Sequence, residues 1–278
     1  MHYLSAKTHT LVRDLMRRHF PNHRPEFLES LFLQADNLFA GNYPGYQRSD
    51  TAYHDLAHTC DATVAVARLL DGHLTGHCLP AIGGRDFQLA IAAILLHDTG
   101  YIKQMGDNEG TGAKYLLTHV QRGMDFAGQL LPSLGVTAAE VKVIQSAIQR
   151  TDAHINESQM SFASSVAKYI ACIVATADIL SQMAARDYPE RLADLYKEYV
   201  EATAYSGLHG NGIASYHSVE DLLCGTREFY EAHIQRLLTE QLGEVYRDLE
   251  YHFGNGNNLY LTAIEANLQR IDRLVAVR

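Results

Sequence analysis

The chain has no tryptophan, only six prolines and only four cysteines among its 278 residues. The cysteines are widely spaced and form no Cys-x-x-Cys pair, which argues against a disulfide framework or a zinc knuckle. Basic residues are also in deficit, with 23 Lys and Arg against 32 Asp and Glu and a formal net charge of −9. An extended groove for nucleic acid is therefore not expected, and any anionic ligand must be small and bound locally.

Long apolar runs are lacking as well. Residues 1–20 contain no apolar segment before a small-residue cleavage site and so do not resemble a signal peptide. The longest apolar stretches, residues 89–96 and 166–180, fall short of the roughly 20 residues that a membrane span needs. We therefore expect a cytoplasmic protein without membrane association, and the cysteine usage agrees with a reducing compartment.

Apolar residues do recur every three or four positions along most of the chain. This spacing is typical of helices that each bury one stripe, and no segment shows the convincing alternation of a strand. The sequence predicts an all-α protein of about ten helices in one domain. We expect a core at about residues 45–205 and a helical C-terminal extension at about 216–278, which packs on the same domain or forms a homodimer.

Histidine and aspartate occur at unusual places in this helical pattern. His54 and His58 are four residues apart, a spacing that places two side chains on the same face of a helix. Such a pair alone is more often a surface feature than a pair of metal ligands. His97 and Asp98 end the uncharged segment 89–96, which must be buried all round. Asp98 then either caps a turn or has a cationic partner in the core.

A third segment presents the same problem. Asp178 follows Val174 by four positions and so lies on or beside the apolar stripe of its helix. The basic residues Lys168 and Arg186 are ten and eight positions away, too far to pair with it along the helix. Its partner must therefore come from tertiary structure or be a metal ion.

Taken together, the three segments offer two imidazoles and two carboxylates: His58, His97, Asp98 and Asp178. A mixed nitrogen and oxygen set of this kind suits Zn, Mn, Fe or Mg. The order His…His-Asp…Asp resembles the ligand pattern of the HD-domain superfamily of metal-dependent phosphohydrolases. The segment LLHDTGY, residues 95–101, is similar to the dyad segment of that superfamily.

A narrower resemblance lies in YHDLAHTCDAT, residues 53–63. It is similar to the Tyr-His-Asn-x-x-His-Ala-x-Asp-Val signature of class I cyclic-nucleotide phosphodiesterases, with Asp55 in place of the asparagine. Thr151 and Asp152 resemble the Thr-Asp element that precedes the last metal-binding aspartate of that class. The resemblance covers about residues 50–182 and implies an HD-type helical bundle. The glutamine and phenylalanine that hold the purine in the animal enzymes have no recognisable counterpart here.

The resemblance also implies roles for individual residues. His58, His97, Asp98 and Asp178 would hold one divalent ion, with Asp98 bridging to a second, and His54 would be the general acid that protonates the departing ester oxygen. Tyr53 and Asp61 would orient the histidines. Apart from what the resemblance implies, Glu109 is a candidate for holding the second ion's waters or orienting a substrate. The other candidates for the pocket or for substrate contact are Thr151, Asp152 and His154. The implied substrate is a small phosphorylated nucleotide, with a cyclic nucleotide as the first choice.

Three alternatives remain open at this point. His54-Asp55-Leu56-Ala57-His58 also resembles the zinc-protease pattern His-Glu-x-x-His, in which both histidines bind one zinc. An HD-type enzyme with another substrate, such as a nucleotidase or an alarmone hydrolase, uses the same ligands. A non-catalytic nucleotide-binding sensor or scaffold would use the pocket without turnover.

Overall fold

The computed structural model describes residues 3–152, 155, 157–207 and 216–276. His154 lies outside the described residues. Within them no β-strand forms, and an isolated antiparallel bridge pairs Tyr46 with Gln104. The all-α expectation is confirmed. The α-helices are α1 (Tyr3–His19), α2 (Glu26–Phe39), α3 (Leu56–Thr75), α4 (Gly84–Leu96), α5 (His119–Leu130), α6 (Ala138–Gln149), α7 (Ser165–Ala184), α8 (Tyr188–Ser206), α9 (Val219–Phe229), α10 (Asp248–Phe253) and α11 (Leu259–Ala276).

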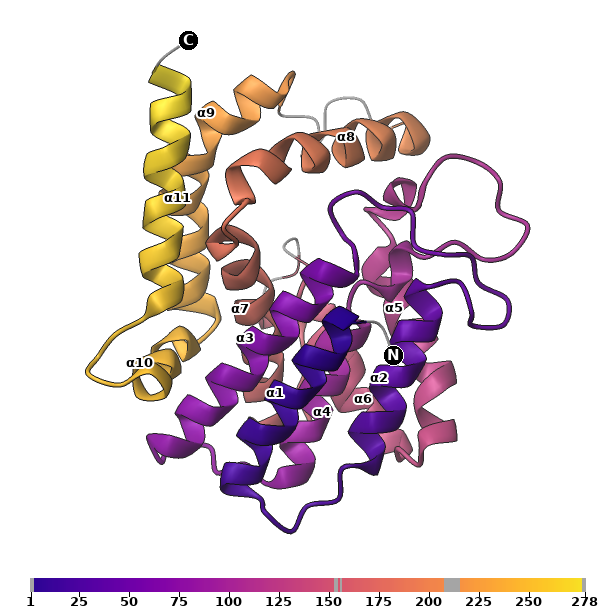
Figure 1. The fold of residues 1–278 in the computed structure, drawn as a ribbon, viewed down its shortest axis with the longest axis vertical. Coiled ribbons are helices and arrows are strands. Elements are labelled where there is room, and N and C mark those ends of the chain that lie inside the picture. The colour runs from indigo at the N-terminus through magenta and orange to yellow at the C-terminus, as the bar shows by residue number, and fades with distance from the viewer. Residues whose placement is uncertain (1–2, 153–154, 156, 208–215, 277–278) are drawn as a thin grey trace.

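Helices α3, α4 and α7 form the centre of the bundle, with α1, α2 and α6 packed around them (Figure 1). All residues of α4 from Phe87 to Leu96 are buried, as the uncharged sequence predicts. In α7 the stripe through Ile170, Ile173, Val174 and Ala177 is buried as well. The central helices thus carry His58, His97 and Asp178 at the ends or edges of a continuous apolar core.

Helix α7 has 20 residues, more than the segment 166–180 indicated. By length and composition it is the one described helix that passes the criteria for a membrane span, and 72% of its apolar window is buried inside the protein. Such burial is also found in the core helices of globular proteins.

The C-terminal helices pack on the central bundle. Helix α10 contacts α3, and α11 contacts α7, α8 and α9. Figure 1 shows α9 and α11 side by side along one edge of the molecule. The helical segment after α9 differs from the regular helix expected there, because residues Tyr230–Ile234 and Leu237–Gln241 form π-helical turns.

Helix α3 begins later than the spacing of His54 and His58 indicated. Its N-cap is Asp55, whose side chain accepts a hydrogen bond from the backbone N–H of His58 at 2.9 Å. Aspartate and asparagine are equally good N-caps, so the replacement of the signature's asparagine by Asp55 keeps this helix start. His54 therefore precedes the helix, and the expectation that both histidines project from one helical face is wrong.

Gly100 allows the turn after His97-Asp98 to approach α5 closely. A Cβ atom built on Gly100 would lie 1.8 Å from the backbone oxygen of His119. We expect Gly100→Ala to lower the free energy of unfolding by about 1–3 kcal/mol or more, because backbone must move. Gly128→Ala is the control, since its Cβ would meet only the amide end of Gln145. Urea denaturation that finds Gly100→Ala as stable as Gly128→Ala would contradict this account of the turn.

Candidate metal centre

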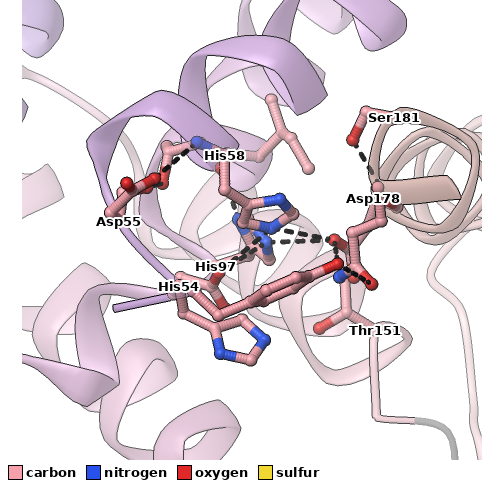
Figure 2. A network of polar contacts seen from close by, with 12 residues as sticks. His54, Asp55, His58, His97, Thr151, Asp178 and Ser181 are labelled. Atoms are coloured by element: carbon pink, nitrogen blue, oxygen red, sulfur yellow. Dashed lines mark hydrogen bonds and ion pairs between the residues drawn. The ribbon is translucent and has the colours of Figure 1, made fainter. Parts of the chain in front are cut away.

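The structure brings together the four side chains that the sequence singled out as metal ligands. His58 lies in the first turn of α3, His97 directly follows α4, and Asp178 lies in α7. His58 Nε2 is 3.2 Å from both Asp98 Oδ2 and Asp178 Oδ1. His97 Nε2 is 3.2 Å from Asp98 Oδ2 and 3.5 Å from Asp178 Oδ1. Figure 2 shows His58, His97 and Asp178 converging from separate elements.

These contacts are close enough for ion pairing but do not have hydrogen-bond geometry. Among the described residues, His58 Nε2, His97 Nε2 and Asp98 Oδ2 are buried without a hydrogen-bond partner. Unpaired buried polar atoms are costly, and a group of them at one point needs a shared partner. The candidate ligand atoms of His58, His97 and Asp178 lie within 4.8 Å of one another, a spread that a single divalent cation can bridge. The donor set therefore fits a metal ion.

A backbone contact determines which ring nitrogen of His97 carries the proton. Its Nδ1 is 2.7 Å from the carbonyl oxygen of Ile94, which can only accept a hydrogen bond. Nδ1 therefore carries the proton, and in the neutral ring Nε2 offers its lone pair toward Asp98 and Asp178. On the other side of the centre, Gln182 donates to Asp178 Oδ1 at 3.3 Å.

Charges in the centre stabilise one another in the metal-free protein. Burial disfavours the charged form of His58, but the carboxylates of Asp178 and Asp98 outweigh it and raise the imidazole pKa to about 10. The pKa of His97 is also raised, because Asp98 and Asp178 outweigh its burial. Burial opposes the charged forms of Asp98 and Asp178, yet His97 and His58 hold both carboxyl pKa values below the usual range.

A pH dependence follows for the metal-free protein. The folded pKa of His58 is raised from 6.5 to about 10, so its contribution to stability is complete below pH 6.5 and is lost as pH rises toward 10. We expect the free energy of unfolding of EDTA-treated protein to fall between pH 6.5 and 10, and to fall less in His58→Asn. Chemical denaturation at both pH values measures this. Equal pH slopes in the parent and His58→Asn would contradict it.

His54 lies beside this centre but belongs to a different set of contacts. Its Nδ1 is 2.5 Å from Glu198 Oε2, and its ring centroid is 5.8 Å from that of His58. The other carboxylate oxygen of Glu198 accepts from the backbone N–H of Tyr53 at 2.6 Å and of His54 at 3.3 Å. Glu198 thus fixes the position and orientation of the His54 ring and leaves Nε2 available for proton transfer.

Glu198 was not predicted, although the sequence contains a signal for it. It lies in α8 three residues after Leu195 and four before Ala202, and all three are buried. A carboxylate on the apolar stripe of an amphipathic helix needs a partner, by the same argument that identified Asp178.

Aromatic rings enclose His54 on another side. The Tyr101 ring stacks on His54 with centroids 4.5 Å apart and on His119 with centroids 4.3 Å apart. His119 Nδ1 contacts the Leu116 carbonyl oxygen at 2.6 Å, which directs Nε2 to 3.8 Å from Asp98 Oδ1. Burial lowers the pKa of His119 and favours its neutral ring, which can act as a ligand or an acceptor. His119 thus lies beside the carboxylate oxygen of Asp98 that faces away from His58.

The remaining candidates lie at varying distances from the centre. Tyr53 is buried, contacts the edge of the His54 ring with centroids 5.0 Å apart, and donates to Gln182 at 3.4 Å. Asp61 has an exposed side chain and lines a small pocket with Tyr53 and His58. Neither makes a hydrogen bond to a histidine in the described part of the chain, so the proposed orienting role of Asp61 lacks a direct contact.

Thr151 and Asp152 follow α6. The Thr151 hydroxyl donates to the carbonyl oxygen of Ile148 at 2.8 Å, and Figure 2 includes Thr151 in the view of the centre. Glu109 is exposed on the loop before residues Gly112–Tyr115, and its side chain makes no contact with the four central residues in the described part of the chain. Its expected contact with the second ion's waters is therefore not seen in the described structure.

Two lysines in or next to this loop are already paired with carboxylates. Lys103 Nζ is 2.8 Å from Asp50, and Lys114 Nζ is 2.5 Å from Asp107. Both ammonium groups are buried and paired. A role in meeting a substrate phosphate would require these pairs to break, which makes it unfavourable.

Comparisons with known proteins bear on the fold. No protein-family model matches the chain, and no curated protein matches its sequence. The structure is similar to that of LmjPDEB1, a Leishmania class I phosphodiesterase, in complex with IBMX, with a TM-score of 0.56 and 11% sequence identity. The match covers 99% of this chain and 88% of that chain. What the two share is the helical fold.

Proposed function

We propose that this protein is a metal-dependent phosphohydrolase that cleaves a phosphoester in a small nucleotide, with a cyclic nucleotide as the first candidate. The observation that carries the proposal is the convergence of His58, His97, Asp98 and Asp178. At this point His58 Nε2, His97 Nε2 and Asp98 Oδ2 are buried without a hydrogen-bond partner among the described residues. The signature around His54 and the fold shared with LmjPDEB1 support the phosphodiesterase version.

Different residues would serve metal binding, proton transfer and positioning in this reaction. A divalent cation held by the four ligands would supply Lewis-acid stabilisation of the phosphoryl group and would activate water. His54, held through Nδ1 by Glu198, gives a proton from Nε2 to the departing ester oxygen. Tyr101 and Tyr53 border the His54 ring and limit its rotation. His119, whose Nε2 is 3.8 Å from Asp98 Oδ1, would help to hold a second ion or a water.

The zinc-protease alternative fits the structure less well. In that reading His54 and His58 share one ion, but the candidate ligand group contains His58 together with His97 and Asp178 and does not include His54. The HD-type nucleotidase and alarmone hydrolase readings use the same ligands as the phosphodiesterase reading. The sensor reading differs in predicting nucleotide binding without turnover.

A matrix of divalent metals against a panel of substrates tests the proposal. The panel contains cyclic nucleotides, linear dinucleotides, nucleoside monophosphates and triphosphates, and an alarmone, with His54→Ala and Asp98→Ala as the inactivated variants. We expect metal-dependent turnover of at least one member, lost in Asp98→Ala. Turnover by Asp98→Ala at the parent rate would overturn the mechanism, and tight nucleotide binding with no turnover under any metal would favour the sensor.

A further inference from the structure

A second group of potential metal ligands lies at the opposite end of α3. It consists of His73 in the last turns of α3, Cys78 in the following turn and Asp248 at the start of α10. One ligand atom from each of the three residues lies within 4.8 Å of the others. His73 and Asp248 are buried, and Cys78 is half-buried, so the group has one side near solvent.

The hydrogen bonding of His73 directs its Nδ1 toward a carboxylate. Its Nε2 is 2.8 Å from the carbonyl oxygen of Pro80, which accepts only, so Nε2 carries a proton. Its Nδ1 lies 3.2 Å from Asp248 Oδ2, a contact that is a hydrogen bond when Nδ1 also carries a proton and that a metal ion can replace. Two acceptors at this distance repel unless a proton or a metal ion lies between them.

The Asp248 carboxylate also accepts a hydrogen bond from a tyrosine. The Tyr169 hydroxyl donates to Asp248 Oδ2 at 2.8 Å, and the Tyr169 ring lies against His73 with centroids 4.1 Å apart. A carboxylate oriented by a tyrosine and an imidazole oriented by a carbonyl are the outer contacts usual around metal ligands. The site therefore has both the ligands and the groups that orient them.

Backbone packing also brings Asp248 to His73. A Cβ atom built on Gly72 would lie 1.8 Å from the backbone oxygen of Asp248, so only glycine permits this approach of α10 to α3. The residue next to His73 in the chain thus lets the two helices come close enough for a shared ligand.

We propose that His73, Cys78 and Asp248 bind a zinc ion that fastens the C-terminal helices to α3. One nitrogen, one thiolate sulfur and one carboxylate oxygen form a borderline-soft set that favours zinc, and a water completes a tetrahedron on the side of half-buried Cys78. The thiol releases its proton to solvent on binding. The site is separate from the His58 centre, whose four ligands offer no sulfur.

Cobalt substitution tests the site without relying on activity. Cobalt(II) added to metal-stripped protein is expected to give a thiolate-to-cobalt charge-transfer band in the near ultraviolet, because Cys78 supplies a sulfur ligand. Cys78→Ser should lose the band, whereas Cys224→Ser, at an exposed cysteine in α9, should keep it. Zinc content by mass spectrometry should be one ion per chain lower in Cys78→Ser than in Cys224→Ser.

One further variant separates this site from the proposed function. Asp178→Asn removes a ligand of the His58 centre and should leave the charge-transfer band unchanged. Absence of the band in the parent protein, or a band of equal intensity in Cys78→Ser, would overturn the zinc proposal and leave His73 and Asp248 as a buried ion pair.

Discussion

Asp98→Asn is expected to abolish most metal binding and to lower kcat by about a thousandfold or more. The substitution keeps the shape of the side chain but removes a charge that faces both His58 and His97 at 3.2 Å. Loss of a catalytic metal removes several kcal/mol of transition-state stabilisation, and each 1.4 kcal/mol corresponds to about a tenfold change in rate. Metal analysis after dialysis and steady-state kinetics measure the two effects.

Asp194→Asn is the matched control for this change. Asp194 lies in α8 and pairs at 2.8 Å with Lys197 on the surface, away from the centre's ligands. It should keep the parent's metal content and kcat. If Asp98→Asn binds metal and turns over substrate like Asp194→Asn, Asp98 is not a ligand.

His54→Ala is expected to lower kcat by about 10²- to 10⁴-fold while leaving metal content intact, because it removes proton transfer and no ligand. The loss should depend on the leaving group. With a p-nitrophenyl phosphoester, whose leaving group departs without protonation, His54→Ala should approach the parent rate. His217→Ala, at an exposed position, is the control and should be neutral with both substrates.

The same experiment distinguishes the acid from its positioning residue. Glu198→Gln keeps an acceptor for the His54 ring but loses the charge, so we expect a smaller loss of about 10- to 100-fold and an altered pH profile of kcat. An equal loss with natural and p-nitrophenyl substrates in His54→Ala would contradict the role of His54 as general acid.

Patterns within single helices predicted much of this architecture. The uncharged segment 89–96 required burial on all sides, and every residue of α4 from Phe87 to Leu96 is buried, with His97 directly after the helix. Asp178 required a partner from outside its helix, and the structure places His58 and His97 beside it. Such predictions succeed because burial of a charge within a known helical period restricts the possible environments.

Other features depend on tertiary packing that spacing does not encode. Helix α3 begins only at Leu56, because Asp55 is its N-cap. His54 therefore lies before the helix, where its ring contacts Glu198. Lys103 pairs with Asp50 on the segment before α3, and Lys114 pairs with Asp107 in its own loop; no periodicity indicates either pair. The argument used for Asp178 also applies to Glu198, but α8 contains several other charged residues, so its sequence does not single out Glu198.

An anomalous difference map from crystals grown with manganese tests the central claim most directly. The account predicts a peak within bonding distance of His58 Nε2, His97 Nε2, Asp98 Oδ2 and Asp178 Oδ1. A fully occupied manganese ion elsewhere, with these four side chains hydrogen-bonded to one another and no peak between them, would contradict it.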